Sequence, residues 1–349
     1  MPYTWTLLGA CVLLLPLPSL GRPHPPKRER PGKALAAQPP ATASDAQSLL
    51  RLMLQAEKSL SLSGSQTTTI SRGGREVTSE QRVMRNGSRA LRLEYIRPAN
   101  LAGEQIVDDG HLFRRYIPAT NTLEVSPSRI QRLGGRMRQV MEQIARSELS
   151  VQTVGQAAIA GRACRIIEVT PKGASKTGRR RFWIDPTNGA QLRIDQFNVN
   201  GQRVSTSYYT DIAYNPTFAP DAFRAPKTPD TVRTLTPQVG TPLPSVAQAQ
   251  AQAGFTVLQP SYLPPGFRFQ SASLSDYRKR KLVALRYVNG LNVFSLFETP
   301  RPTNARPETS KRPRHPRNGV LTAEQGDLRL VLIGNLSSDD MERVLASVR

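Results

Sequence analysis

The feature that most constrains the fold is a long series of short segments with alternating polar and apolar residues, separated by tight-turn signals. Asn86-Gly87 is the strongest of these signals, because both residues accept the positive φ angles of a two-residue hairpin turn. In the segment after it, Leu91, Leu93 and Tyr95 fall on one face of a strand. The pattern predicts an antiparallel meander. Its predicted strands are Gln66–Ile70, Glu76–Met84, Ala90–Ile96, His111–Ile117, Leu149–Val154, Cys164–Thr170, Arg179–Ile184, Gln191–Phe197 and Arg203–Thr210.

Helical periodicity interrupts the meander at two places. Ser44-x-x-Gln47 is a capping-box pattern, and apolar residues follow it at helical spacing. A second helix is predicted from Ser126 to Ser147, where Gly134-Gly135 indicates a kink or a break between two short helices, and a mobile lid. We therefore expect an α+β fold, in which a curved, half-open antiparallel sheet is covered by helices and followed by a smaller α+β domain. Such a sheet leaves an apolar cleft beneath the helices.

The N-terminus carries an apolar run from Thr6 to Leu20, which is short for a membrane span but has the length of a signal-peptide core. No Lys or Arg precedes the run, so an uncleaved anchor stays open as the alternative. We predict a signal peptide over residues 1–21 and a disordered, basic, Pro-rich tether over residues 22–42. Cys11 lies inside the run, which argues against lipidation, and without it Cys164 has no disulfide partner.

Residues 220–244 are rich in Pro and Thr, and we interpret them as a linker between a first domain at 43–219 and a second at 245–349. The second domain is predicted to begin with the helix Ser245–Ala253 and to close with a helix from Ser337. A basic, Pro-rich stretch at 299–318 has no assigned role. The strands of this domain are predicted at Phe267–Leu274, Lys281–Tyr287, Leu291–Phe297, Val320–Glu324 and Leu328–Ile333.

The chain is strongly basic, with 48 Lys and Arg residues against 26 Asp and Glu and a net charge of +22. The basic residues are spread along the whole chain, mostly as Arg, and no helix-turn-helix, zinc-finger or RNA-binding motif accompanies them. Together with the export signal, this favours an anionic membrane surface or an acidic partner, and no nucleic acid is expected as a partner.

No sequence motif carries recognisable catalytic or metal-binding chemistry. His24, His111 and His315 have no Cys, Asp or Glu at metal-ligand spacing, so no metal and no cofactor is expected. Asp108-Asp109 precedes a glycine and is interpreted as a turn rather than as a pair of catalytic carboxylates. The sequence therefore favours a non-catalytic binding protein over an enzyme.

Motifs in both halves of the chain resemble the LolA/LolB/RseB superfamily, in particular its MucB/RseB branch. In the first domain they are Asp109-Gly110 with Tyr116 and Pro118, Ala160-Gly161-Arg162 with Ile166–Pro171, Phe182–Pro186 with Asn188-Gly189 and Leu192–Ile194, and Gly201 with Thr210–Ile212. In the second they are Tyr262–Phe267, Tyr287–Phe297 and Arg329–Val348. The basic tether and the 299–318 stretch depart from the family pattern.

The resemblance implies a periplasmic protein of the cell envelope. It would hold an acyl chain, lipid or lipoprotein in the first domain and contact the periplasmic segment of an anti-sigma factor, shielding that segment from proteolysis. An apolar cleft suits an alkyl chain, because each buried methylene group is worth about 0.8 kcal/mol. Each candidate is equally consistent with an ordinary core position. The candidates for this cleft are Leu91, Leu93, Tyr95, Phe113, Trp183, Leu192, Ile194 and Phe197.

Three functions stay open at this point. The first is a regulatory sensor of the envelope stress response that detects lipid or lipoprotein and modulates an anti-sigma factor. The second is a lipoprotein or lipid carrier without a signalling role. The third is a polyanion-binding structural protein or an envelope hydrolase.

Overall fold

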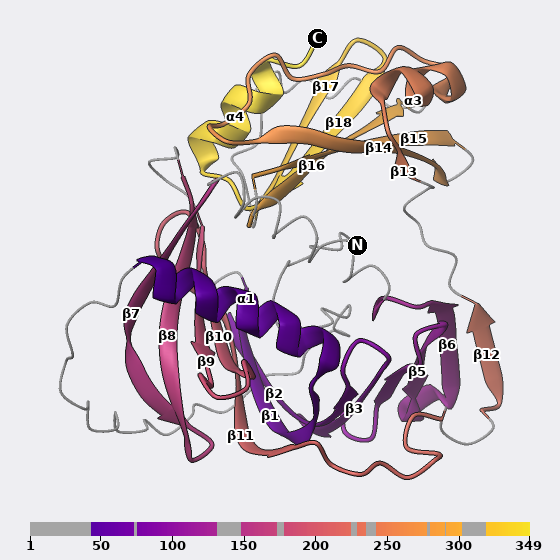
Figure 1. The fold of residues 1–349 in the computed structure, drawn as a ribbon. Helices are drawn as coiled ribbons and strands as arrows, with labels where there is room; N and C mark the ends of the chain where they lie inside the picture. Colours follow the sequence, from indigo (N-terminus) through magenta and orange to yellow (C-terminus); the bar gives the residue numbers. More distant parts are fainter. Residues whose placement is uncertain are drawn as a thin grey trace.

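The computed structural model describes residues 43–72, 75–130, 148–172, 178–224, 229–234, 242–277, 280–289, 291–301 and 319–349. These residues form two β-sheets with few helices (Figure 1). The predicted signal peptide and tether, most of the helix predicted at 126–147, and most of the 299–318 stretch lie outside the described residues.

The first sheet has twelve strands and curves strongly, with α1 (Ala43–Ser59) lying across its β7–β10 end (Figure 1). The strands are β1 (Ser61–Arg72), β2 (Arg75–Asn86), β3 (Ala90–Arg97), β4 (Gln105–Asp108), β5 (Leu112–Ile117), β6 (Thr122–Pro127), β7 (Leu149–Ile159), β8 (Arg162–Pro171), β9 (Arg179–Ile184), β10 (Gln191–Phe197), β11 (Arg203–Tyr214) and β12 (Thr231–Thr234). A short 3-10 helix, η1 (Pro118–Thr120), joins β5 to β6. The order is β12-β6-β5-β4-β3-β2-β1-β11-β10-β9-β8-β7. This arrangement confirms the expected curved antiparallel sheet with a helix over one face.

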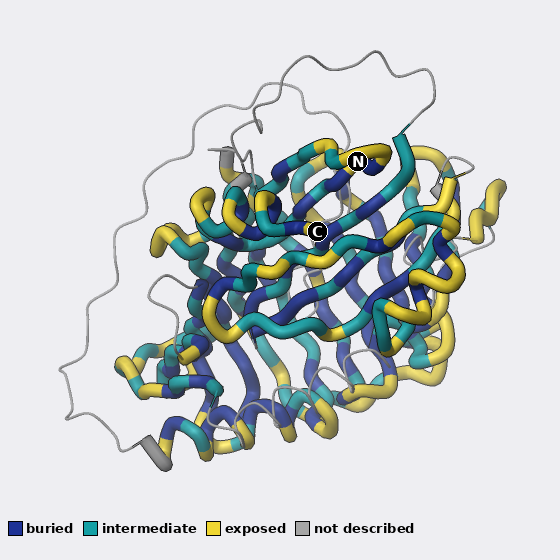
Figure 2. Tube along the Cα trace, turned by 90° about the horizontal axis from the view of Figure 1, so that it is seen from above, coloured by how far each residue is buried: buried dark blue, intermediate teal, exposed yellow. Residues whose placement is uncertain are grey.

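The apolar stripe of α1 anchors the helix to the sheet. Leu50, Met53 and Leu54 recur at helical spacing and are buried against Ile167 of β8 and Phe182 of β9. Full burial of one such side chain stabilises the fold by about 1.5–3 kcal/mol. Buried and partly exposed positions alternate along many of the strands, as the period of two requires (Figure 2).

The predicted start of the second helix at Ser126 is wrong, because Ser126 and Pro127 are the last residues of strand β6. Leu123 and Val125 alternate with polar residues, and this strand pattern pairs in register with β5. The helical conformation begins only at Ile130. The segment Ser128–Ile130 between β6 and this helix donates three hydrogen bonds to the carboxylate of Asp108. The short strand β4, which the sequence analysis left as a turn region, pairs with β3 and β5.

The second sheet has six strands in the order β13-β14-β15-β16-β18-β17. Its core lies between the sheet and two helices, and includes Leu285, Phe294 and Leu332 from the strands and Met341 and Val344 from the closing helix. The predicted helices and strands of this half are present within a few residues. Those predicted are α3 (Val246–Ala253), β14 (Arg268–Tyr277), β15 (Arg280–Val288), β16 (Val293–Pro300), β17 (Val320–Gln325), β18 (Leu328–Gly334) and α4 (Ser338–Ala346). The short strand β13 (Pro242–Leu243) was not predicted.

The stretch interpreted as a linker contributes a short strand to each sheet. Strand β12 pairs in parallel with β6, and β13 pairs with β14. All four residues of β12 are exposed, so this strand is held chiefly by backbone hydrogen bonds.

The two sheets contact each other through the loop between β15 and β16. Leu291 is 2 % exposed and belongs to the same apolar cluster as α1. The guanidinium of Arg180 donates to the carbonyl of Leu291 at 2.7 Å, and Arg268 pairs with Glu148 at 2.7 Å. A Cβ at Gly178 would lie 2.7 Å from the Asn292 side chain, so only glycine fits at this contact. The second domain thus completes part of the core of the first.

Candidate ligand-binding site

Four candidate ligand residues lie on neighbouring strands of the first sheet. Leu93 pairs with Val83 of β2 and Ile106 of β4, and all three are buried. The cluster continues to Ala56 and Leu60, at the C-terminal end of α1. The four candidates of this part are Leu91, Leu93 and Tyr95 of β3 and Phe113 of β5, each at most 8 % exposed.

Trp183 of β9 and Leu192 of β10 belong to the same apolar cluster, although their strands lie several places away from β3 and β5 in the sheet. Leu192 is fully buried at an irregularity in the pairing of β9 with β10. The guanidinium of Arg193, which pairs with Trp183 in register, lies 4.5 Å from the centroid of the indole ring. Six of the eight candidates therefore share one cluster.

Ile194 and Phe197 lie elsewhere. Ile194 pairs with Phe182 and packs in the second cluster, beneath α1. Phe197 is only partly buried, and the guanidinium groups of Arg179 and Arg181 lie 4.4 Å and 5.3 Å from its ring centroid. The eight candidates do not form a single continuous lining.

A row of buried polar side chains crosses β2, β1 and β11, between Tyr95 of one apolar cluster and Ile194 of the other. The side-chain amide of Gln81 donates to Gln66 at 3.0 Å and to Thr68 at 3.1 Å, and the hydroxyls of Thr68 and Ser207 lie 2.9 Å apart. In register, Gln81 is opposite Tyr95, and Ser207 is opposite Ile194. The sequence analysis missed this row, because residues 65–69 are all polar and do not show which of them face the interior.

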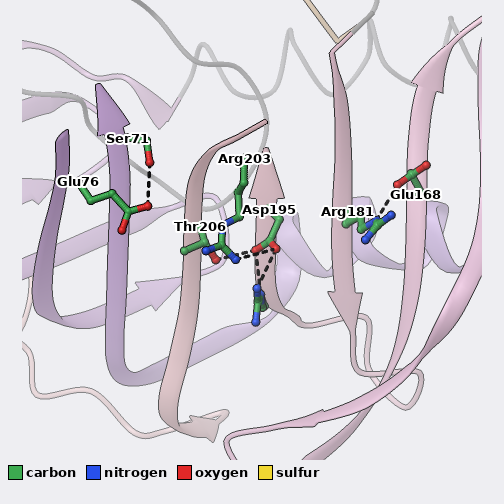
Figure 3. Close-up of polar contacts among 8 residues, drawn as sticks. Ser71, Glu76, Glu168, Arg181, Asp195, Arg203 and Thr206 are labelled. Carbon is green, nitrogen blue, oxygen red and sulfur yellow. Dashed lines mark hydrogen bonds and ion pairs between the residues drawn. The ribbon is translucent and has the colours of Figure 1, made fainter. Parts of the chain in front are cut away.

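The opposite face of β8 to β11 is charged (Figure 3). Asp195 accepts from Arg193 at 2.8 Å and from the Thr206 hydroxyl at 2.6 Å, and Arg203 lies 3.9 Å away. A second carboxylate, Glu168, pairs with Arg181 at 2.6 Å and with Arg179 at 3.2 Å. Because four arginines share two carboxylates, this group carries an excess of positive charge.

A depression of about 420 Å³ lies over the middle strands of the first sheet. Four of its lining residues are charged, namely Arg82, Arg92, Glu94 and Asp211, so its chemistry differs from that of the apolar clusters. Ser63 pairs with Met84 and Ser65 with Arg82, which places these residues on the face opposite Val83. The lining residues are Ser63, Gly64, Ser65, Arg82, Val83, Met84, Arg92, Glu94, Asp211, Ile212 and Ala213.

The two carboxylates of Asp108-Asp109 both serve the local backbone. Asp108 accepts from the amide N–H groups of Gly110 and Arg129, at 3.0 Å and 2.7 Å. Asp109 accepts from the amide of Leu112 at 2.8 Å. Desolvation raises the pKa of Asp109, but hydrogen bonds from Arg114 and from the backbone outweigh it and lower that pKa to about 2. Both side chains thus stabilise a turn, as the sequence predicted.

The free thiol of Cys164 is buried in the first sheet. Burial and the nearby charge of Asp185 raise the pKa of the free thiol of Cys164 to about 11, so the thiol stays protonated at neutral pH. Within the described part of the chain, no three His, Cys, Asp or Glu side chains lie close enough to hold a metal ion. No helix in that part is both long enough and apolar enough to cross a membrane.

Comparison with solved structures shows the fold over both domains. MucB in complex with the periplasmic part of MucA is 19% identical, with a TM-score of 0.58, over 87% of this chain and 98% of that chain. The MucA/MucB complex of Pseudomonas aeruginosa is also 19% identical, with a TM-score of 0.59 over the same shares. No curated protein sequence matches the chain.

The family model for the MucB/RseB N-terminal domain matches residues 45–227. This range covers all but the first two residues of α1 and the whole of strands β1 to β11. The match extends over more than half of the chain, and this protein belongs to the MucB/RseB family.

Proposed function

We propose that this chain is a regulatory protein of the cell envelope that binds the exported segment of an anti-sigma factor. The observation that carries the proposal is the similarity, over both domains, to MucB in complex with the periplasmic segment of MucA. The direct contacts between the two domains support a surface to which both contribute, because Leu291 and Arg180 hold them together.

Titration calorimetry tests this proposal. The full mature chain would be titrated with the recombinant extracytoplasmic segment of the anti-sigma factor from the same genome, and with a scrambled segment of equal composition. We expect saturable binding of the native segment alone. Equal heats from both segments, or none from either, would refute the proposal.

We further propose that the first domain senses an acyl chain of a lipid or lipoprotein. Six of the eight candidate residues share one apolar cluster, which supports the proposal. The buried row of Gln66, Thr68, Gln81 and Ser207 borders that cluster, so it suits a ligand that has an ester or amide next to its alkyl chain.

A matched pair of cavity-forming variants tests the acyl site. Leu93→Ala removes a cluster residue that is 2 % exposed, and Leu285→Ala removes a fully buried residue of the second domain. Both should lose about 2–5 kcal/mol of stability. Only Leu93→Ala should change the affinity for spin-labelled palmitic acid, measured by electron paramagnetic resonance on folded protein. Equal effects of the two variants would contradict an acyl site in the first domain.

A carrier role is the alternative outcome of these two experiments. It would be favoured if the chain bound the palmitoyl probe but not the anti-sigma segment. The excess of arginine over carboxylate on the charged face of β8 to β11 supports an anionic membrane surface as an additional partner.

A further inference from the structure

The four edges of the two sheets are protected very unequally. β12 has four residues and includes Arg233, β13 has two residues and includes Pro242, and β17 has six and includes Glu324. β7 has eleven residues, none of them charged and none of them proline. Short length, charge and proline are the usual means by which proteins prevent pairing at a sheet edge. Among the sheet edges in the described part of the chain, β7 is therefore the one with the least protection against a further strand.

The outward backbone groups of β7 can be assigned from its pairing with β8. Lys172 donates its N–H to the carbonyl of Glu148 at 2.8 Å. The next pair, Leu149 with Pro171, cannot be a hydrogen-bonded pair, because proline has no N–H. Bonded and non-bonded pairs alternate in an antiparallel ladder, so Leu149, Val151 and Thr153 direct their N–H and C=O groups away from β8. Within the described residues, no strand pairs with β7 on that side.

The surroundings of β7 are basic. Arg162 and Arg165 of β8 lie opposite the C-terminal half of β7 in register. Arg179 and Arg181 follow on β9, the next strand of the sheet, and share the single carboxylate of Glu168, so an excess of positive charge remains. A second copy of this chain would bring another charge of +22 to the edge, which disfavours pairing between two β7 strands. An extended acidic segment is attracted by the same charges.

We infer that β7 is the docking edge for an extended, acidic segment of the anti-sigma partner, which adds to the first sheet as a thirteenth strand. This inference rests on the proposed function, because the partner is the one proposed there. Backbone hydrogen bonds supply the affinity. The exposed residues Gln152, Val154 and Ala158 of β7 are uncharged, so none of them repels the charged side chains of an added strand.

Hydrogen exchange of the full chain tests the inference without any mutation. With the recombinant anti-sigma segment bound, the amides of Leu149, Val151 and Thr153 should exchange at least tenfold more slowly, roughly the factor set by one hydrogen bond. Binding without slower exchange at these amides would overturn the strand addition and leave the proposed function intact. Absence of any binding would overturn both. Protection of β7 that depends on the concentration of the chain alone would assign the edge to self-association and also overturn the inference.

A pair of substitutions at one position gives the second test. Thr153→Pro removes an outward N–H, and Thr153→Val keeps it with nearly the same shape. Among the described residues, the Thr153 hydroxyl has no hydrogen-bond partner to lose. We expect Thr153→Pro to weaken binding of the segment about tenfold and Thr153→Val to leave it within about twofold. Thermal unfolding of both variants verifies that they are folded. Equal affinities of two folded variants would overturn the inference.

Discussion

Each of the two domains contains a buried carboxylate, and the two carboxylates differ in how many hydrogen bonds they accept. Asp108 of the first domain is 1 % exposed, and its oxygens accept from the Ser128 hydroxyl at 2.7 Å and from the amide of Arg129 at 2.7 Å, among others. Glu298 of the second domain is fully buried, and one oxygen accepts from the amide of Leu258 at 2.9 Å. The other oxygen has no hydrogen-bond partner within the described residues.

The difference follows from the place of each residue in its strand. Asp108 ends β4, where the turn after it and the segment after β6 bring backbone N–H groups that donate to its carboxylate. Glu298 lies within β16, whose backbone groups are already paired with β15 and β18. Burial therefore raises the pKa of Glu298 to about 7. A buried carboxylate stabilises the fold where the chain supplies hydrogen-bond donors. Where the chain does not, the carboxylate lowers the free energy of unfolding as it loses its proton at higher pH.

The largest expected effect is at Asp108. Asp108→Ala leaves several buried donors without an acceptor and should lower the free energy of unfolding by about 4 kcal/mol. Urea unfolding, followed by the fluorescence of Trp183, reports on the first domain. Asp108→Asn, which keeps one acceptor oxygen, should lose less. A loss below about 1 kcal/mol for the alanine variant would contradict the claim that hydrogen bonds to Asp108 stabilise the first domain.

The second effect is the pH dependence caused by Glu298. Its pKa rises from 4.5 in the unfolded chain to about 7 in the folded one, so folding favours the protonated form. The stability it contributes is complete below pH 4.5 and is lost as pH rises to 7, by about 3 kcal/mol in total. Chemical denaturation at pH 4.5 and at pH 8 measures this loss. In the Glu298→Gln variant, the decrease in stability between pH 4.5 and pH 8 should be smaller than in the wild type by that amount. A decrease as large as that of the wild type would contradict the role of Glu298.

The smallest effect is expected at Glu168, which is partly exposed and pairs with Arg179 and Arg181. Glu168→Gln should lower the free energy of unfolding by less than about 1 kcal/mol, because solvent and salt screen such pairs. The same denaturation experiment, repeated in 0.1 M and 1 M salt, would show the difference shrinking. A loss as large as that of Asp108→Ala would show that burial does not set the ranking.

Much of the fold was predictable from the sequence, because alternation and Asn-Gly turns are local signals. Asn86-Gly87 and Asn188-Gly189 both join paired strands, as expected. β6 was missed because its residues run directly into an apolar pattern with helical spacing. The boundary between strand and helix is marked by the hydrogen bond from Ser128 to Asp108, which lies 20 residues earlier in the sequence. Glu298 was not recognisable as buried, because it directly follows the predicted strand Leu291–Phe297, and a charged residue in such a place is ordinarily exposed.

The candidate site was predictable in part. Six apolar candidates meet in one cluster, because strand alternation places them correctly. Ile194 separates from Leu192 because the pairing of β9 with β10 is irregular between Gln191 and Arg193. The polar row at Gln81 and Thr68 depends on the pairing of three strands, which no single segment of the sequence reveals.

The central claim, that this chain regulates an anti-sigma factor by binding its exported segment, is tested most directly by a proteolysis assay. The segment would be digested by a nonspecific protease with and without an equimolar amount of the full mature chain, and its half-life followed by mass spectrometry. The account predicts a longer half-life in the presence of the chain, and a smaller gain with Thr153→Pro than with Thr153→Val. An unchanged half-life with the wild-type chain would contradict it.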